Sequence, residues 1–87
     1  MTITFLPNAP RSTPNTTVAF DAEYNGAHVI CEISAEALDD HFGAISLSDT
    51  DLVAAFEGNR GIIEAAARGV LPHRAPTGRC FLVSADF

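Results

Sequence analysis

The dipeptide Asn25-Gly26 lies between two runs rich in alternating apolar residues, at about 16–24 and 27–33. Asn-Gly favours a two-residue type I′ turn, because both residues tolerate the positive φ angles that this turn requires. A turn at this point pairs Phe20 with Cys31 and collects the apolar side chains of both strands on one face. A shift of one residue would move that whole set toward water, so turn and pattern predict a single register.

The predicted pairing gives the hairpin one apolar face and one mixed face. The apolar face carries the pairs Tyr24–Ala27, Ala22–Val29, Phe20–Cys31 and Val18–Ile33. The other face carries the pairs Glu23–His28, Asp21–Ile30 and Ala19–Glu32. We expect Glu23 and His28 to form a solvated cross-strand pair, a contact that contributes about 0.2–1 kcal/mol.

The size of the chain, 87 residues with 47% hydrophobic and 18% charged side chains, predicts a single globular domain over residues 1–87. No apolar run approaches the roughly 18–20 residues of a membrane span, and the N-terminus does not resemble a secretion signal. Two cysteines, Cys31 and Cys80, are too few for a disulfide framework, so we expect a cytoplasmic protein. A Cys31–Cys80 bridge would require that their strands be neighbours.

Charge is distributed unevenly along the chain, whose formal net charge is −6. Residues 1–57 carry one arginine and nine acidic residues, whereas residues 58–87 carry four arginines and two acidic residues. Nucleic acid is disfavoured as a partner, because its binding depends on neutralising phosphates. The acidic and arginine-rich parts could instead provide complementary surfaces for association.

The remaining elements follow from start and stop signals. Residues 2–6 predict a short strand that Pro7 ends, and the proline-rich residues 7–15 predict a surface loop. Ser34 is a candidate N-cap for a helix over 35–42, and Gly43 suits its C-terminal end. Residues 71–78 read as a loop and residues 79–85 as a final strand.

Ser48 precedes an apolar arc at helical spacing, which predicts one helix over about 49–68 that stops at Gly69. The alternative is a break between Gly58 and Gly61, because each glycine costs roughly 1 kcal/mol in a helix. The resulting order, β-β-β-α-α-β, predicts the α+β class. We expect a small antiparallel sheet with two helices packed on one face.

Several blocks of the sequence, in order along nearly the whole chain, resemble a bacterial family. They are residues 18–20, 31–38, Ala55-Phe56, Asn59-Arg60, Ile63-Glu64, Ala66-Ala67 and Asp86-Phe87. Together they resemble the family catalogued as domain of unknown function 1488. The resemblance implies a small bacterial α+β domain and assigns no activity, cofactor or site residue.

The residue types that carry chemistry do not form a catalytic or metal-binding pattern. His28, His41 and His73 fall on a strand, a helix and a loop without metal-ligand spacing, so we predict no metal and no cofactor. Cys31 lies on the apolar face, and Glu32 beside it would oppose ionisation of the thiol. We therefore interpret Cys31 as a buried hydrophobic residue and predict no catalytic residue.

Asn59 is the most unusual position, because it falls near the middle of the apolar arc with Arg60 at its edge. A buried amide without a hydrogen bond costs about 1–3 kcal/mol. In the favoured, structural interpretation, Asn59 bonds the backbone of a neighbouring strand or loop, while Arg60 covers the core and pairs with an acid. In the functional interpretation, Asn59 and Arg60 line a cleft, with His41 nearby and Arg60 holding a carboxylate or phosphate.

A second group of candidate partner contacts lies in the last third of the chain, at Arg68, His73, Arg74 and Arg79. These cations could meet the acidic Asp39-Asp40 or Asp49–Asp51 region of another copy. The first hypothesis is therefore a non-enzymatic binding or regulatory module that self-associates or binds another protein, without nucleic acid or membrane. The alternative is a small ligand-binding domain or enzyme centred on Asn59 and Arg60.

Overall fold

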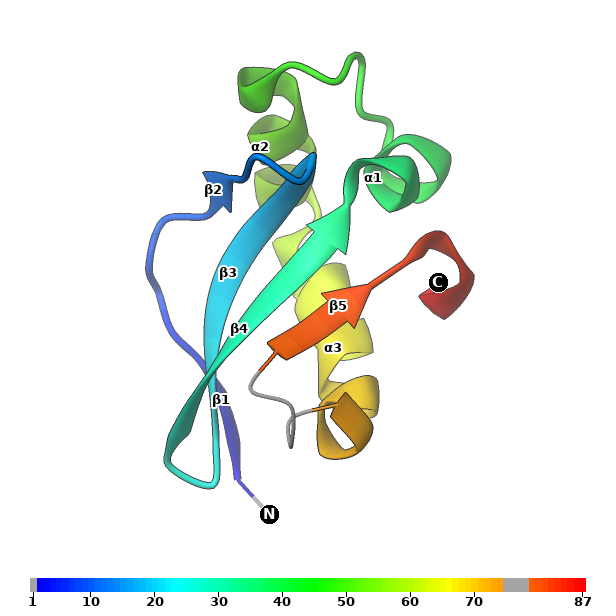
Figure 1. Cartoon of the computed structure of the whole chain (residues 1–87). Helices are drawn as coiled ribbons and strands as arrows, with labels where there is room; N and C mark the ends of the chain where they lie inside the picture. Colours follow the sequence, from blue (N-terminus) through cyan, green and yellow to red (C-terminus); the bar gives the residue numbers. More distant parts are fainter. Residues whose placement is uncertain (1, 75–78) are drawn as a thin grey trace.

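The computed structural model describes residues 2–74 and 79–87. The elements in chain order are β1 (Ile3–Phe5), β2 (Arg11–Ser12), β3 (Thr17–Tyr24), β4 (Ala27–Ser34), α1 (Ala35–Phe42), α2 (Asp49–Gly58), α3 (Arg60–Arg74), β5 (Arg79–Leu82) and the 3₁₀ helix η2 (Ser84–Asp86). Figure 1 shows α2 and α3 behind the sheet and α1 beyond the end of β4. The α+β class is confirmed, and the described residues form three α-helices instead of the two expected.

The β3–β4 hairpin has the predicted register. Phe20 pairs with Cys31 and Tyr24 with Ala27. The turn residues Asn25 and Gly26 have φ angles of 52° and 86°, both in the region that Asn-Gly tolerates. The hairpin was predictable because turn chemistry and hydrophobic alternation specify the same pairing.

The sheet has the order β1-β3-β4-β5, with β2 also paired to β3. β1 and β2 run antiparallel to β3, but β5 runs parallel to β4, so the expectation of a wholly antiparallel sheet is wrong. Parallel neighbours need a long crossover, and the helical segment between β4 and β5 supplies one. Two boundaries also differ, because the expected 7–15 loop contains β2 and the last strand ends at Leu82.

Helix α1 has the predicted ends. The Ser34 hydroxyl accepts a hydrogen bond from the Ala37 backbone N–H at 3.1 Å. Gly43 ends the helix with a φ of 69°, a left-handed conformation that favours glycine. Local capping therefore fixes both ends of this short helix, and Leu38 anchors it in the core with no exposed surface.

The predicted single helix over 49–68 is divided at Asn59, so the alternative break is the correct one. Asn59 has φ −131° and ψ 21°, and its backbone N–H donates to Phe56 O at 3.0 Å in a tightened last turn. Exposed Gly58 and Gly61 flank the break and weaken helix propensity on both sides. Asparagine also competes for backbone hydrogen bonds, which favours an end at this position.

Helix α3 continues to Arg74, past the predicted stop at Gly69 and through Pro72. Leu71 has no exposed surface and Val70 packs against the core, so apolar burial outweighs the two unfavourable residues. The loop predicted for 71–78 is therefore wrong for 71–74, and positions 75–78 lie outside the described residues.

The hydrophobic core lies between the helices and one face of the sheet. Phe20 from β3 contacts Phe56 of α2 and Phe5 of β1, with ring centroids 4.9 and 6.2 Å apart. The neighbouring strand residues Ala19 and Asp21 point away from this core, yet they are also buried. On the second face of the sheet, the strand residues are buried by side chains of the N-terminal segment and of β5, and not by helices.

Candidate functional site

The sheet face opposite the helices buries polar side chains. Thr17, Asp21 and Glu32 are exposed to only 1%, 6% and 4%. They alternate along β3 and β4 with the apolar residues that face the core, as the pleat of a strand requires. Buried carboxylates need charged or hydrogen-bonding partners, so the side chains around them define the chemistry of this face.

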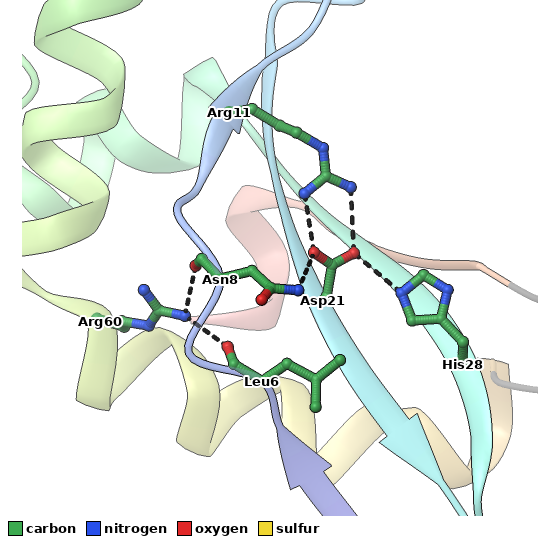
Figure 2. A network of polar contacts seen from close by, with 6 residues as sticks. All are labelled: Leu6, Asn8, Arg11, Asp21, His28 and Arg60. Atoms are coloured by element: carbon green, nitrogen blue, oxygen red, sulfur yellow. Dashed lines mark hydrogen bonds and ion pairs between the residues drawn. The ribbon is translucent and has the colours of Figure 1, made fainter.

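Asp21 is held by three side chains, as Figure 2 shows. Arg11 binds it through two nitrogens at 2.9 and 3.1 Å, and Asn8 Nδ2 donates at 3.2 Å. His28 Nε2 donates to the same carboxylate at 3.0 Å, so its observed partner is Asp21 and not the directly opposite Glu23. The hydrogen bond from Arg11 is the main cause that lowers the pKa of Asp21 to about 2.

Glu32 is buried on the same face and joins two strands. Arg79 Nη1 of β5 donates to Glu32 Oε2 at 2.6 Å, and the Thr17 hydroxyl of β3 donates to Oε1 at 2.6 Å. The carboxylate therefore links the edge strand β5 to the hairpin through charged and neutral hydrogen bonds.

Two ion pairs on this face expose the cation and bury the anion. The side-chain exposures are 47% and 7% for Arg11–Asp21 and 64% and 6% for Arg79–Glu32. Arg74 of α3 and Asp86 of η2 are both partly buried, with side-chain exposures of 35% and 12%. The buried carboxylates fix the positions of the exposed guanidinium groups through these ion pairs. Solvent or a partner consequently meets positive charge first, although the whole chain is acidic.

Two of the hollows in the described part of the chain adjoin Arg79. The larger, of about 430 Å³, is lined by Asn15, Glu32, His73, Arg74, Arg79 and Phe81, with Cys80 in its wall. The second, of about 240 Å³, shares Asn15, Glu32 and Arg79 with the first and extends to Arg11. Together they form a cationic groove that extends from the helix-free side of the sheet, past β5, to the C-terminal end of α3, and Arg79 lines both hollows.

Asn59 and Arg60 make contacts within the fold. Asn59 Nδ2 donates to Ala55 O at 2.9 Å, inside its own helix and not to a strand or loop as the structural interpretation expected. Arg60 pairs with Glu64 at 2.9 Å, and its Cζ lies 5.5 Å from the centre of the Phe56 ring. Arg60 also donates to Leu6 O, at 3.0 Å (Figure 2).

The N-terminal segment connects Arg60 to the polar face of the sheet. A second bond from Arg60 Nη2 reaches Asn8 O at 3.3 Å, and the Asn8 amide donates to Asp21. Figure 2 shows this path from α3 across residues 6–8 to β3. Arg60 therefore holds residues 6–8 in position, and Asn8 of this segment contacts Asp21.

Arg68 and Arg74 bind backbone groups at opposite edges of the sheet. Arg68 donates to Ile3 O of β1 at 3.2 Å, and its Cζ lies 5.3 Å from the centre of the Phe5 ring. Arg74 donates to Phe81 O of β5 at 2.7 Å, beside a bidentate pair with Asp86. The Asp86 carboxylate in turn accepts from the Val83 N–H at 2.8 Å. Side chains thus occupy hydrogen-bonding groups at both edge strands.

His41 contacts the C-terminal turn, and no contact among residues 2–74 and 79–87 joins it to Asn59 or Arg60. The Ser84 hydroxyl donates to Asp40 at 2.7 Å, while His41 Nε2 lies 3.0 Å from Ser84 O and 3.2 Å from Ser84 Oγ. Bonding the carbonyl requires a proton on Nε2, so that nitrogen cannot take the serine proton. The three residues therefore lack the arrangement of a nucleophilic triad.

Within the described part of the chain, no three His, Cys, Asp or Glu side chains gather as metal ligands. None of its helices combines the length and apolarity needed to cross a bilayer. Arg11 and Asp21 were missed as a site from the sequence, because Arg11 lies in a proline-rich segment without periodicity. Only the place of Asp21 on the mixed face of the hairpin pointed to a polar cluster.

The model of a family described as "Protein of unknown function (DUF1488)" matches residues 3–82. The chain belongs to the DUF1488 family. The fold of this DUF1488 member is similar to the crystal structure of a protein of unknown function from the same family of Shewanella loihica PV-4, with a TM-score of 0.75 and 21% identity. The match covers 92% of this chain and 90% of that one. Among curated proteins, no relative matches.

Proposed function

We propose that this DUF1488 protein is a non-enzymatic binding module that associates with a second copy of itself through the cationic groove. The groove would receive the acidic surface formed by α1 and the start of α2. The observation that carries this proposal is the outward placement of Arg11 and Arg79 over the buried carboxylates Asp21 and Glu32 in an acidic chain.

The acidic surface offers charge of the opposite sign. Glu36 and Asp39 on α1 and Asp49 at the start of α2 are all exposed. Unlike Asp21, Glu32 and Asp86, these carboxylates lie at the surface, where a guanidinium of another molecule can reach them. Complementary charges of this kind steer association and select orientation.

Exposed apolar side chains accompany both charged surfaces. Ile45 and Leu47, between α1 and α2, are 89% and 66% exposed, and Phe81 in the groove is 44% exposed. Burial of apolar side chains contributes affinity that solvent-exposed ion pairs alone do not provide. One surface combines acidic residues with Ile45 and Leu47, and the other combines arginines with Phe81. This combination supports an interface between two copies in which both charged and apolar side chains make contact.

The test is the molar mass in solution, measured by light scattering at roughly 0.1 mM protein. We expect an oligomer at about 50 mM salt that dissociates at about 0.5 M salt, where charges at the surface are screened. A monomer at both salt concentrations would contradict self-association.

A charge-neutral variant tests the interface without disturbing the buried pairs. The double substitution Glu36→Gln and Asp39→Asn is expected to weaken association roughly tenfold, since each exposed pair contributes up to about 1 kcal/mol. Glu57→Gln is the matched control, because Glu57 is exposed near the other end of α2. Equal weakening by the control would mean that overall charge, and not this surface, governs association.

A further inference from the structure

Cys31 and Cys80 lie directly opposite each other in the parallel β4–β5 pair. Neighbouring strands are about 4.7–4.9 Å apart, which falls inside the 4.4–6.8 Å range of Cα separations in disulfides. Both thiols are free and have no exposed surface. The register therefore places two reduced cysteines where one covalent bond could join the edge strand to the sheet.

The two thiols have different surroundings. Cys80 adjoins the larger hollow beside Arg74 and Arg79, but its side chain, like that of Leu82, lies on the core side of β5 and has no exposed surface. A hydrogen bond from Cys31 lowers the pKa of Cys80 against the opposing effect of burial, and the charge of Arg74 lowers it further against that of Asp86. The bond to Cys80 and burial both raise the pKa of Cys31. Nearby guanidinium groups favour the reactive thiolate, a second thiol in reach can resolve the oxidised form, and local opening of the edge strand β5 would give an oxidant access to the buried sulfur.

We propose that Cys80 is a peroxide-sensitive thiol that forms a reversible disulfide with Cys31. The oxidant is a small hydroperoxide, such as hydrogen peroxide, that would reach the buried thiol when the edge strand β5 opens locally. The inference is independent of self-association, because it rests on the β4–β5 register and on the surroundings of the two thiols.

The reaction proceeds in two steps. The Cys80 thiolate attacks one peroxide oxygen and the O–O bond breaks, which leaves Cys80 as a sulfenic acid and releases hydroxide that becomes water on protonation. The Cys31 sulfur, having lost its proton, then attacks the Cys80 sulfur, and the S–O bond breaks to release a second water. Two thiols lose two electrons in total, and the peroxide gains them.

The disulfide would stabilise the fold by closing the long loop between β4 and β5. A cross-link of this kind reduces the freedom of the unfolded chain. We expect the Tm of the oxidised chain to rise by about 5–15 °C, with reversal by dithiothreitol.

The experiment treats the full chain with hydrogen peroxide and follows its intact mass and its thiol content in denaturant. We expect a mass loss of about 2 Da, loss of both thiols without intermolecular bonds, and recovery on reduction. Unchanged thiols under conditions that oxidise free glutathione would overturn the proposal. So would a disulfide between molecules, or oxygen addition without the mass loss.

Two serine variants separate the roles of the cysteines. In Cys31→Ser the sulfenic acid of Cys80 persists, and dimedone should trap it. In Cys80→Ser the remaining thiol is expected to react at least roughly tenfold more slowly. If Cys80→Ser reacts as fast as Cys31→Ser, Cys80 is not the attacking residue. Should either serine variant fail to fold, the mass of the wild-type chain still decides whether the bond forms.

Discussion

The two faces of the sheet are both buried, but by different physical means. On the helix side, apolar residues such as Phe20 pack against α2 and α3 and need only the right size and shape. On the other side, Asp21 and Glu32 are buried beneath arginines and need partners at hydrogen-bond distance. The first face supplies apolar burial, and the second links β2, β3, β4 and β5 through charged side chains. This comparison teaches that a small domain can cover a sheet without a second layer of helices.

The largest expected loss of stability comes from replacing a phenylalanine on the helix side of the sheet, and the same substitution on the other face should cost much less. Phe20→Ala removes a ring that is 1% exposed and should destabilise the chain by roughly 3–5 kcal/mol, because it leaves a cavity. Phe81→Ala on the helix-free side removes the same ring from a 44% exposed position and should cost less than about 1 kcal/mol. Urea denaturation measures both variants. Similar losses would show that the helix-free face carries as much apolar packing as the core.

A pH series tests the charged face. The pKa of Asp21 is about 2 in the folded chain and close to 3.9 when unfolded, so the unfolded state binds protons first as the pH falls. The resulting stabilisation, about 2–3 kcal/mol, is complete above about pH 5 and is lost as the pH approaches 2. Asp21→Asn should therefore be less stable than wild type at pH 7 by about this amount, with a difference that shrinks in acid.

Glu23→Gln is the control for that series. Glu23 is next to Tyr24 on the same strand and is only partly buried, so its neutralisation should change stability by no more than about 0.5 kcal/mol. If Asp21→Asn keeps the same deficit at pH 7 and pH 3, the Arg11–Asp21 pair does not supply the pH-dependent stability.

A smaller loss of stability is expected at the junction between α2 and α3, next to Arg60, which hydrogen-bonds the backbone of residues 6–8. Asn59→Ala removes the bond to Ala55 O and should cost about 1 kcal/mol, which lowers Tm by about 4–8 °C. Gly61→Ala is a matched control, because a methyl group there meets nothing within 4 Å, and it should raise stability by about 0.5–1 kcal/mol. Calorimetry measures both. An unchanged Tm for Asn59→Ala would favour a ligand-binding role for Asn59 and Arg60.

The same comparison explains what could be predicted from the sequence. The hairpin register and α1 were predictable because Asn25-Gly26, Ser34 and Gly43 act within a few residues of the structures they determine. The extension of α3 through Pro72 and the parallel pairing of β5 depend on packing between distant segments, for which the sequence has no local signal. The polar face was missed for a related reason, since Arg11 meets Asp21 only after β2 has paired with β3.

The arginines bound to the two edge strands affect how readily the sheets of different molecules can pair in concentrated solution. A strand from another molecule that approached β1 would have to displace the Arg68 guanidinium from Ile3 O, and at β5 it would meet Arg74 on Phe81 O. Ladder growth from molecule to molecule, the first event in cross-β fibre formation, is therefore obstructed on both flanks. Helix α3 carries both of these arginines as well as the core residues Ile63, Ala67 and Leu71, so a change that unwinds it would uncover both sheet edges and open the core in the same step.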